Sequence, residues 1–397
     1  MSEPPSRPRR TLEVFLAFLG QGLTAFGGPV AHLGYFRRAF VERRGWLDDA
    51  AFADLAALCQ FLPGPASSQL GMAIGLRRAG LAGALAAWLG FTLPAGLAMI
   101  AFAQAAPSLG AHWGGGWIHG LKIAAAAVVA QALVAMARTL AARPVTAGMA
   151  IGGAAGLILA PGPAPQVCAL LAGAAFGLAF LRTVQPSAAP DAVPPRGRRG
   201  AVLALALFAG LLIGLPLLAR HDPALALAGV FYRTGALVFG GGHVVLPLLE
   251  SQVVGPGWLD RDTFLAGYGA VQALPGPLFS FAGFVGASQT FAPRGWAGGG
   301  VALVSIFLPS LLLVLGVLPF WDRLKARPGA RGALAGVNAV VVGLLAAALW
   351  DPVLTGAVRS PADAALAVSA FLLLTVVRLP PWAVVAGFAV AVGAFAR

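Results

Sequence analysis

Charged side chains are scarce in this sequence. Only 10% of the 397 residues are Asp, Glu, Lys or Arg, whereas 59% are hydrophobic. A soluble globular domain carries roughly 25% charged residues, so a soluble chain of this length would lack the polar side chains that cover a surface. Apolar runs such as 79–106 and 201–218 are close to or longer than the roughly 20 residues that cross the hydrocarbon core of a bilayer. The composition predicts an all-α, polytopic integral membrane protein embedded in the lipid bilayer.

Cysteine is nearly absent as well. Cys59 and Cys168 lie in separate apolar segments, which argues against a disulfide framework. The histidines show no His-x-x-x-His spacing and the cysteines no Cys-x-x-Cys spacing, so we predict no metal centre and no cofactor. Residues 1–10 are polar and proline-rich rather than a cleavable signal peptide, and we expect them to form a disordered cytoplasmic tail.

Acidic residues are few, and the formal net charge is +13. A basic protein can bind nucleic acid, but here the arginines cluster in short loops between apolar segments. That distribution is typical of the positive-inside rule for membrane proteins. We therefore expect no nucleic-acid partner.

The two halves of the sequence repeat the same elements in the same order. Phe-Gly-Gly occurs at 26–28 and 239–241, and Gln-x-x-Pro-Gly-Pro occurs at 60–65 and 272–277. Gly-Trp-Leu-Asp lies between them in both halves, at 45–48 and 257–260. The paired positions are roughly 212 to 216 residues apart, an offset too constant to arise by chance.

The repeat divides the chain into two units with about 13 apolar segments in total. We expect an N-terminal repeat at 11–182, a proline-rich cytoplasmic linker at 183–199, an unmatched connecting helix at 200–219 and a C-terminal repeat at 220–397. Repeats that contain interrupted helices are a recurrent plan of secondary transporters.

Loop charges predict how the repeats are oriented. The loop at 37–44 carries four arginines, whereas the equivalent loop of the second half is acidic. If every apolar segment spans the membrane, the four-arginine loop lies outside, against the positive-inside rule. If the broken segments dip in and return, every basic loop lies inside, and we favour this alternative. Both alternatives give inverted repeats; the segments left open are 12–35, 50–76, 224–249 and 262–288.

The Pro-Gly-Pro elements predict broken helices. A proline removes a backbone donor and clashes with the preceding turn, so two prolines around a glycine end a helix. The half-helix that follows presents free N–H groups, which favour an anion. The alternative is a packing kink. The substrate-binding candidates here are Gln60, Pro63, Gly64, Pro65, Ser67, Ser68, Gln272, Pro275, Gly276, Pro277 and Ser280.

The Phe-Gly-Gly elements predict hinges or close backbone approach, because glycine adopts dihedrals that other residues avoid. The alternative is small-residue packing between helices, which is common in membranes. Neither element is a dinucleotide or P-loop motif. The glycines concerned are Gly27, Gly28, Gly240, Gly241 and Gly242.

A few ionisable residues lie in or near apolar segments. Lys122 stands at the start of an uncharged segment, where a cation usually faces a cavity or a partner, so we expect it to bind substrate. The alternative is that its ammonium reaches the membrane interface. The candidates for ion coupling are Asp54, Arg233, His243 and Glu250.

The duplicated motifs resemble the chromate ion transporter family in its long two-domain form. The resemblance covers about 11–182 and 224–396. It implies proton-driven efflux of chromate across the bacterial inner membrane, hence chromate resistance, with sulfate as a competitor. A transporter of another oxyanion, a channel and a membrane-embedded enzyme remain alternatives. The enzyme is disfavoured because no catalytic constellation recurs in the apolar segments. A homodimer is possible.

Overall fold

The computed structural model describes residues 6–181, 198–325 and 327–395. Across these ranges the regular elements are all helices, with no strand. Six helices within them are long and apolar enough to cross a bilayer. The predicted all-α, multi-pass membrane class is therefore confirmed. Most of the predicted linker lies outside the described residues.

The part of the chain before residue 182 forms seven α-helices. Their bounds are α1 (Arg7–Thr24), α2 (Gly28–Phe36), α3 (Asp49–Phe61), α4 (Ala66–Trp113), α5 (Gly116–Leu140), α6 (Pro144–Leu159) and α7 (Pro163–Phe180). A π-helical turn, Arg37–Glu42, extends α2. The long α4 is bent at Ala79 and Gly80, which leave the helical region.

The second part begins with α8 (Arg198–Leu218), which closely matches the connecting helix expected at 200–219. The equivalents of the first four helices follow, with α12 and α13 together corresponding to α4. They are α9 (Pro223–Leu237), α10 (Val245–Val253), α11 (Arg261–Val271), α12 (Phe281–Ser288) and α13 (Gly295–Val317). The remaining helices are α14 (Trp321–Lys325), α15 (Pro328–Ala348), α16 (Thr355–Ala357), α17 (Pro361–Thr375) and α18 (Pro381–Phe395).

The N-terminal tail is shorter than the sequence predicts. Helix α1 begins at Arg7 with Pro8 in its first turn, so residues 7–10 are helical. Proline is well tolerated there because the first helical N–H groups have no intrahelical acceptor.

The first two broken segments fold back on themselves. The Phe18 ring of α1 packs on Phe36 and Phe40, which follow the Phe-Gly-Gly break, with centroids 5.3 and 4.6 Å apart. Residues before and after each break also line one pocket of about 420 Å³. Its lining includes Arg10 before the first break, residues 46–48 and 51 between the breaks, and Arg77 after the second. Both segments therefore return to the end of the molecule from which they start.

The equivalent loops of the second half lie at the other end of α4. Residues 259, 260, 262, 263 and 287–290 line a second cavity together with Gln104 and Pro107 of α4. The first pocket contains Arg78, 26 positions earlier in the same helix. The 23 positions from Leu81, just after the bend, to Gln104 correspond to about 35 Å at 1.5 Å rise per residue, more than the thickness of a hydrocarbon core. The two sets of loops are thus separated by about the width of a membrane.

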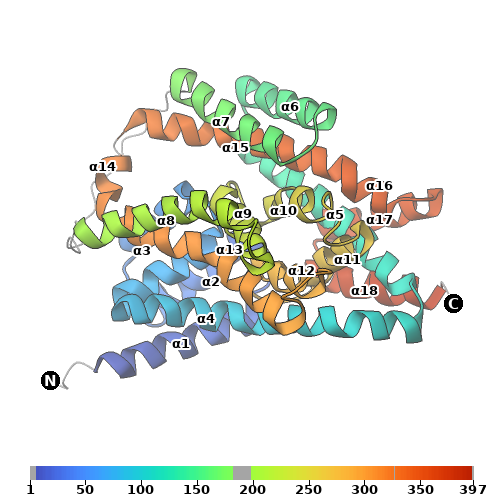
Figure 1. Ribbon diagram of the computed structural model, residues 1–397, viewed down its shortest axis with the longest axis horizontal. Coiled ribbons are helices and arrows are strands. Elements are labelled where there is room, and N and C mark those ends of the chain that lie inside the picture. Colours follow the sequence, from blue (N-terminus) through green and yellow to red (C-terminus); the bar gives the residue numbers. More distant parts are fainter. Residues whose placement is uncertain (1–5, 182–197, 326, 396–397) are drawn as a thin grey trace.

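The last helices of each half pack on the other half. Helix α15 lies against α6 and α7, while α5 lies against α17 and α18. Figure 1 shows α6, α7 and α15 together along the top and α17 and α18 at the right. Glycines allow the α7–α15 contact, because a Cβ at Gly177 or Gly336 would overlap the opposite backbone.

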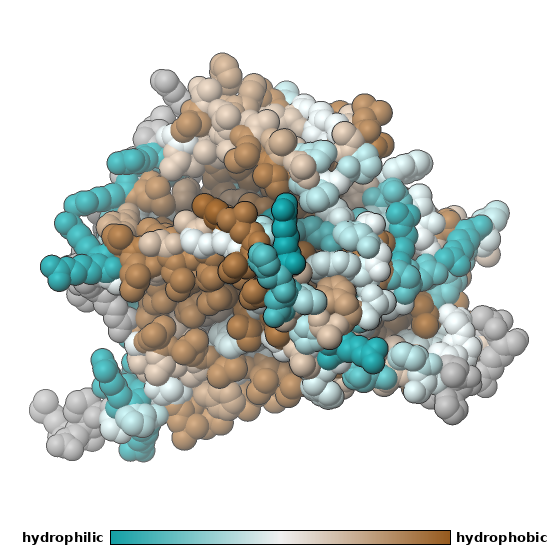
Figure 2. All heavy atoms as spheres, viewed as in Figure 1, coloured by the Kyte–Doolittle hydropathy of each residue, from teal (hydrophilic) through white to brown (hydrophobic). Residues whose placement is uncertain are grey.

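The outer surface is apolar over the long helices. Leu12, Leu85, Leu203 and Leu207 on α1, α4 and α8 are between 39% and 70% exposed. Figure 2 shows hydrophobic side chains across much of this region, with hydrophilic ones toward the left and right and in a smaller patch near the middle of the face. Such a belt is what a lipid-embedded surface requires.

We expect Gly336→Leu to disrupt the contact between the two halves. The added side chain would meet the backbone of Gly173 and force α7 away from α15. Overpacking of this kind costs roughly 1–3 kcal/mol or more, so the purified protein should unfold at a temperature several degrees lower. Gly148→Leu is the control, because nothing lies within 4 Å of a Cβ at that position. Equal unfolding temperatures for the two variants would contradict the packing.

Candidate functional site

The broken segments of the two halves are hydrogen-bonded to each other. The Gly64 N–H in the first Pro-Gly-Pro break donates to the Val238 carbonyl, beside the second Phe-Gly-Gly, at 2.6 Å. Reciprocally, the Gly276 N–H donates to the Ala25 carbonyl, beside the first Phe-Gly-Gly, at 2.9 Å. Each Pro-Gly-Pro break therefore meets the Phe-Gly-Gly break of the other half.

Glycine is required at both crossing points. Gly64 and Gly276 have φ of 118° and 99°, a region that other residues rarely adopt. A Cβ at Gly64 would lie 2.5 Å from the Ser310 hydroxyl, and one at Gly276 would lie 3.3 Å from the Phe91 carbonyl. Each break therefore packs closely on the long apolar helix of the other half, α13 or α4.

The prolines set where the helices stop and restart. Helix α3 ends at Phe61 and α4 begins at Ala66, with Pro65 as its N-cap residue. In the second half, a short 3₁₀ turn, Leu278–Ser280, follows Pro277 and leads into α12. The first N–H groups after each break have no intrahelical acceptor. The two breaks thus bring helix N-termini into the protein interior, as the sequence predicts.

Several buried polar atoms around the crossing lack a hydrogen-bond partner among the described residues. They are the hydroxyls of Ser68, Ser280, Ser310 and Thr92 and the Gln69 carbonyl oxygen. These side chains are at most 3% exposed. Buried polar groups are nearly always paired, so a cluster of unpaired ones requires an explanation. A bound polar ligand supplies one.

Three of these residues were missed in the sequence analysis. Gln69 directly follows the two predicted serines, and its amide nitrogen donates to the Pro63 carbonyl at 2.6 Å. Ser310 directly follows Pro309 on α13, and Thr92 lies two residues before Pro94 on α4. A polar side chain within two residues of a proline in an apolar helix was the signal that could have found both. Ser67, which was predicted, is buried.

The two predicted glutamines have different surroundings. Gln60 is exposed on α3 and does not join the buried polar atoms. Although Gln60 is close to the break in sequence, its side chain is exposed at the surface of the helix. Gln272 is partly buried and lies beside the Tyr268 hydroxyl. That hydroxyl also contacts His243 Nδ1 at 2.8 Å.

Four of the five glycines in and beside the Phe-Gly-Gly elements have the positive φ that other residues avoid. Gly27, Gly28, Gly240 and Gly241 have φ between 74° and 133°, whereas Gly242 begins a 3₁₀ turn with negative φ. Small-residue packing explains little at Gly28 and Gly241, where nothing lies within 4 Å of the position that a Cβ would occupy. Unusual backbone geometry is their main contribution.

Lys122 does not reach the unpaired polar atoms. Its ammonium is 3% exposed and donates to the Asp262 carboxylate at 2.9 Å. Arg359 donates to the same carboxylate at 2.9 and 3.1 Å. Asp262 lies in the first turn of α11, whereas the Pro-Gly-Pro break follows the last turn. The lysine side chain is therefore directed away from the break.

Asp262 is held in its charged form. It lies outside the six candidate membrane spans. Partial burial alone would raise the pKa of its carboxyl, but the hydrogen bonds from Lys122 and Arg359 lower that pKa below its ordinary value. The ion pair therefore persists at neutral pH.

The candidates for ion coupling are dispersed. Asp54 accepts hydrogen bonds from Trp321 and Lys325, both at 3.0 Å. Glu250 lies 3.8 Å from Arg261. Arg233 is partly buried and has no ion-pair partner among the described residues. Of these candidates, His243 is the one within three residues of a break.

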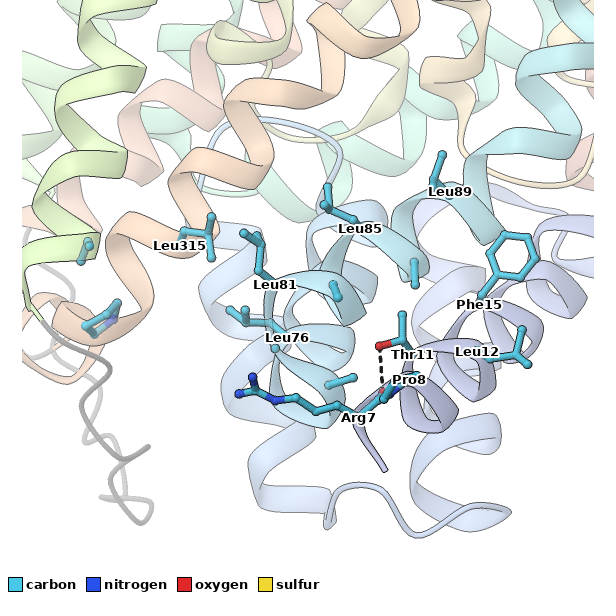
Figure 3. A pocket seen from close by; sticks show the side chains of 17 residues that line it. Arg7, Pro8, Thr11, Leu12, Phe15, Leu76, Leu81, Leu85, Leu89 and Leu315 are labelled. Atoms are coloured by element: carbon cyan, nitrogen blue, oxygen red, sulfur yellow. Dashed lines mark hydrogen bonds between the residues drawn. The ribbon is translucent and has the colours of Figure 1, made fainter. Parts of the chain in front are cut away.

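Two cavities of the described residues differ in chemistry. One, of about 890 Å³, lies between α5, α11 and the end of α4 and is lined by Lys122, Arg294, Arg359, Asp260 and Asp262. The other, of about 1330 Å³, is lined mainly by apolar residues of α1 and α4, among them Leu12, Leu81 and Leu85 (Figure 3). Arg7 lies at its edge in that view. Its apolar lining suits hydrocarbon rather than an anion.

Comparison with known proteins decides the family. A model of the chromate transporter family matches this chain twice, at residues 12–180 and 225–394. The chain belongs to the chromate transporter family. It is accordingly a transporter rather than an enzyme, and the predicted resemblance is confirmed. Because one model matches both regions, the duplication read from the motifs has independent support.

Individual relatives cover nearly the whole chain. The chromate transport protein of Pseudomonas aeruginosa is 30% identical over 90% of this chain and 84% of its own length. That of Cupriavidus metallidurans is 28% identical over 96% of this chain and 92% of its own length. A probable chromate transport protein of Synechococcus elongatus is 28% identical over 84% of this chain and 82% of its own length. No solved structure matches this chain.

We expect Gly64→Ala to reduce transport roughly 5- to 30-fold. A positive φ costs a non-glycine residue about 1–2 kcal/mol, and the new Cβ would also press on the Ser310 hydroxyl. Initial rates of anion uptake into everted membrane vesicles, at matched protein levels, measure the effect.

Gly45→Ala is the matched control for Gly64→Ala. Gly45 also has positive φ, 57°, but nothing lies within 4 Å of a Cβ there. It should therefore carry a comparable backbone cost without disturbing the crossing. If both variants transport equally well, the close packing at Gly64 is not important for transport.

Proposed function

We propose that the protein exports chromate, or a similar tetrahedral oxyanion, from the bacterial cytoplasm across the inner membrane in exchange for protons. Such export would confer chromate resistance. Membership of the chromate transporter family supports the oxyanion substrate. The direction, the proton coupling and the inner-membrane location are our inferences.

The crossing of the breaks is the observation that carries this proposal. A tetrahedral dianion needs several convergent donors, and helix N-termini supply them without a fixed positive charge. Ser68, Ser280 and Ser310 bury hydroxyls that have no partner among the described residues, so they are able to donate to an oxyanion. We assign the anion to this crossing, together with Ser67, Gln69 and Gln272.

Lys122 and Gln60 would reach an anion at the crossing only after a change of conformation. The Leu121 carbonyl, next to Lys122, packs on Gly269, three residues before Gln272. The lysine backbone is thus near the end of α11, although its ammonium points to the start of that helix. Lys122 would contact the anion only after leaving Asp262. Gln60 would do so only by reorienting α3.

We infer that the halves are inverted repeats and that transport alternates access by moving one against the other. Two observations support the inversion. The equivalent loops lie about 35 Å apart along the part of α4 that follows its bend, and both breaks of the first half turn back toward the end where α1 starts. Re-entrant segments of this kind are consistent with the basic loop at 37–44 lying inside.

His243 is our first choice for the proton-coupling group. It follows the second Phe-Gly-Gly break and contacts the Tyr268 hydroxyl. Histidine is the side chain whose ordinary pKa is nearest to neutrality. Asp54 and Glu250 lie beside the basic side chains of Lys325 and Arg261. No contact within the single chain bears on the possible homodimer.

Sulfate is the main alternative substrate, because it is also a tetrahedral dianion. Hydroxyls and backbone N–H groups recognise shape and charge, and both anions share these properties. A channel is the alternative of another class, and it would conduct without responding to a proton gradient.

We expect everted vesicles that contain the protein to accumulate chromate when a pH gradient is imposed. One pH unit is worth about 1.4 kcal/mol per proton exchanged, which sustains a roughly tenfold anion gradient. Collapsing the pH gradient should abolish accumulation. Accumulation that ignores the gradient would contradict antiport, and competition by excess sulfate would measure selectivity.

We expect Ser280→Ala to separate stability from anion binding. An unpaired buried hydroxyl costs about 1–3 kcal/mol, so without anion the variant should unfold at the same or a higher temperature. The stabilisation that added chromate gives should be smaller than in the parent protein. Ser369→Ala is the control, because Ser369 is exposed and bonded to the Ala365 carbonyl. Undiminished stabilisation in Ser280→Ala would remove Ser280 from the site.

A further inference from the structure

Lysine is used only twice in this chain, at Lys122 and Lys325, although it has 27 basic residues. Both ammonium groups are withdrawn from the surface, with side chains 3% and 10% exposed. The other basic residues are arginines, and their ion pairs such as Arg37–Asp49 and Arg261–Asp351 are far more exposed. The two lysines therefore differ from the rest of the basic residues in both type and burial.

The first lysine joins the N-terminal half to the C-terminal half. Lys122 is on α5, and its partner Asp262 is in the first turn of α11, the helix that ends at the second Pro-Gly-Pro break. Arg359 shares the Asp262 carboxylate. We call the Lys122–Asp262 contact the α11 pair.

The second lysine makes the reciprocal connection. Lys325 is on α14 of the C-terminal half and donates at 3.0 Å to Asp54 of α3, the helix that ends at the first Pro-Gly-Pro break. Lys325 also contacts Asp322 on its own helix, and Trp321 donates to Asp54. We call the Lys325–Asp54 contact the α3 pair.

The two pairs lie at opposite ends of α13. The start of α13, at Gly295, lies against Gln104, which lines the same cavity as Lys122. The far end leads directly into α14 and Lys325. The 23 residues of α13 correspond to about 35 Å at 1.5 Å per residue. Figure 1 shows α3 and α14 at the left and α11 at the right.

Helices α3 and α11 are the same element of the two repeats. Each is tied to the opposite half by one lysine, although Asp54 and Asp262 are not at equivalent positions within them. A partly buried ion pair contributes little net stability when formed, but breaking it leaves a costly unpaired charge. Such a contact favours two discrete states, closed or open, over intermediate ones.

We propose that the α11 pair and the α3 pair are two gates that open one at a time, each admitting the anion to the breaks from one end of the molecule. This inference rests on the alternating-access part of the proposed function. Opening the α11 pair frees the start of α11 and uncovers the cavity beside Lys122. Opening the α3 pair frees α3 from α14 at the other end.

The test measures the access of a polar maleimide to single thiols in the full-length protein. The parent carries Cys59→Ala and Cys168→Ser, because Cys168 is exposed and Cys59 lies on α3, where it would report the same opening as the introduced thiol. Ala266→Cys reports on α11, and Ala56→Cys reports on α3. Both alanines are nearly buried, at 5% and 7% exposure. Labelling rates are compared with and without Asp262→Asn or Asp54→Asn.

We expect Asp262→Asn to speed labelling of the Ala266→Cys thiol at least about fivefold, a typical size for coupling between sites. Labelling of the Ala56→Cys thiol should stay the same or slow down. Asp54→Asn should have the opposite pattern. If either substitution speeds both thiols, or if neither speeds its own, the gate proposal is overturned.

Two further variants guard against general loosening of the fold. Asp262→Glu keeps the carboxylate and should label like the parent. Arg261→Gln removes the neighbouring exposed ion pair to Asp351 and should also label like the parent. Accelerated labelling in Arg261→Gln would show that any disturbance at the start of α11 opens the cavity, and would count against the α11 pair.

The labelling experiment needs no anion, so its result is independent of the substrate. A reciprocal labelling pattern in a protein that does not transport chromate would support the gate proposal and refute the proposed function. Chromate accumulation without a reciprocal labelling pattern would keep the function and refute the gates.

Discussion

The structure depends on two backbone hydrogen bonds, from Gly64 to Val238 and from Gly276 to Ala25. Inside a membrane protein, backbone that leaves a helix has no water to bond and must find partners in the protein. Here each break satisfies part of this need with the break of the other half. Neither half can therefore satisfy the hydrogen bonds of its breaks alone. At the periphery the halves also depend on each other, because α6 and α7 pack on α15 while α17 and α18 pack on α5.

The same constraint shapes the chemistry at the centre. Close backbone approach requires glycines and leaves little room for long side chains, so the polar groups there are small hydroxyls and amides such as Ser280 and Ser310. Fixed positive charge is kept at the two ends, where Lys122 and Lys325 are already neutralised by aspartates. A centre of neutral donors can hold a dianion and still release it, since it provides no permanent counter-charge.

Local rules predicted some of the site well and the rest poorly. The prolines and glycines located both breaks, because they act on their own backbone. Ser68 and Ser280 were found because they follow the breaks directly. Gln60 lies next to a break in sequence but is exposed, apart from the buried polar atoms, since neighbours in sequence can occupy different faces of a helix. Ser310 was missed because its counterpart in the first half is Ala95, so the repeat gave no signal.

The sequence by itself determined the membrane class, the duplication and the positions where helices break. Each of these follows from the composition or from the effect of a residue on the backbone within a few positions of it. Only the tertiary structure decided that each Pro-Gly-Pro break meets the Phe-Gly-Gly of the other half, and that Lys122 binds Asp262 rather than the break. Such contacts join residues far apart in the chain, and their choice depends on how all the helices pack together.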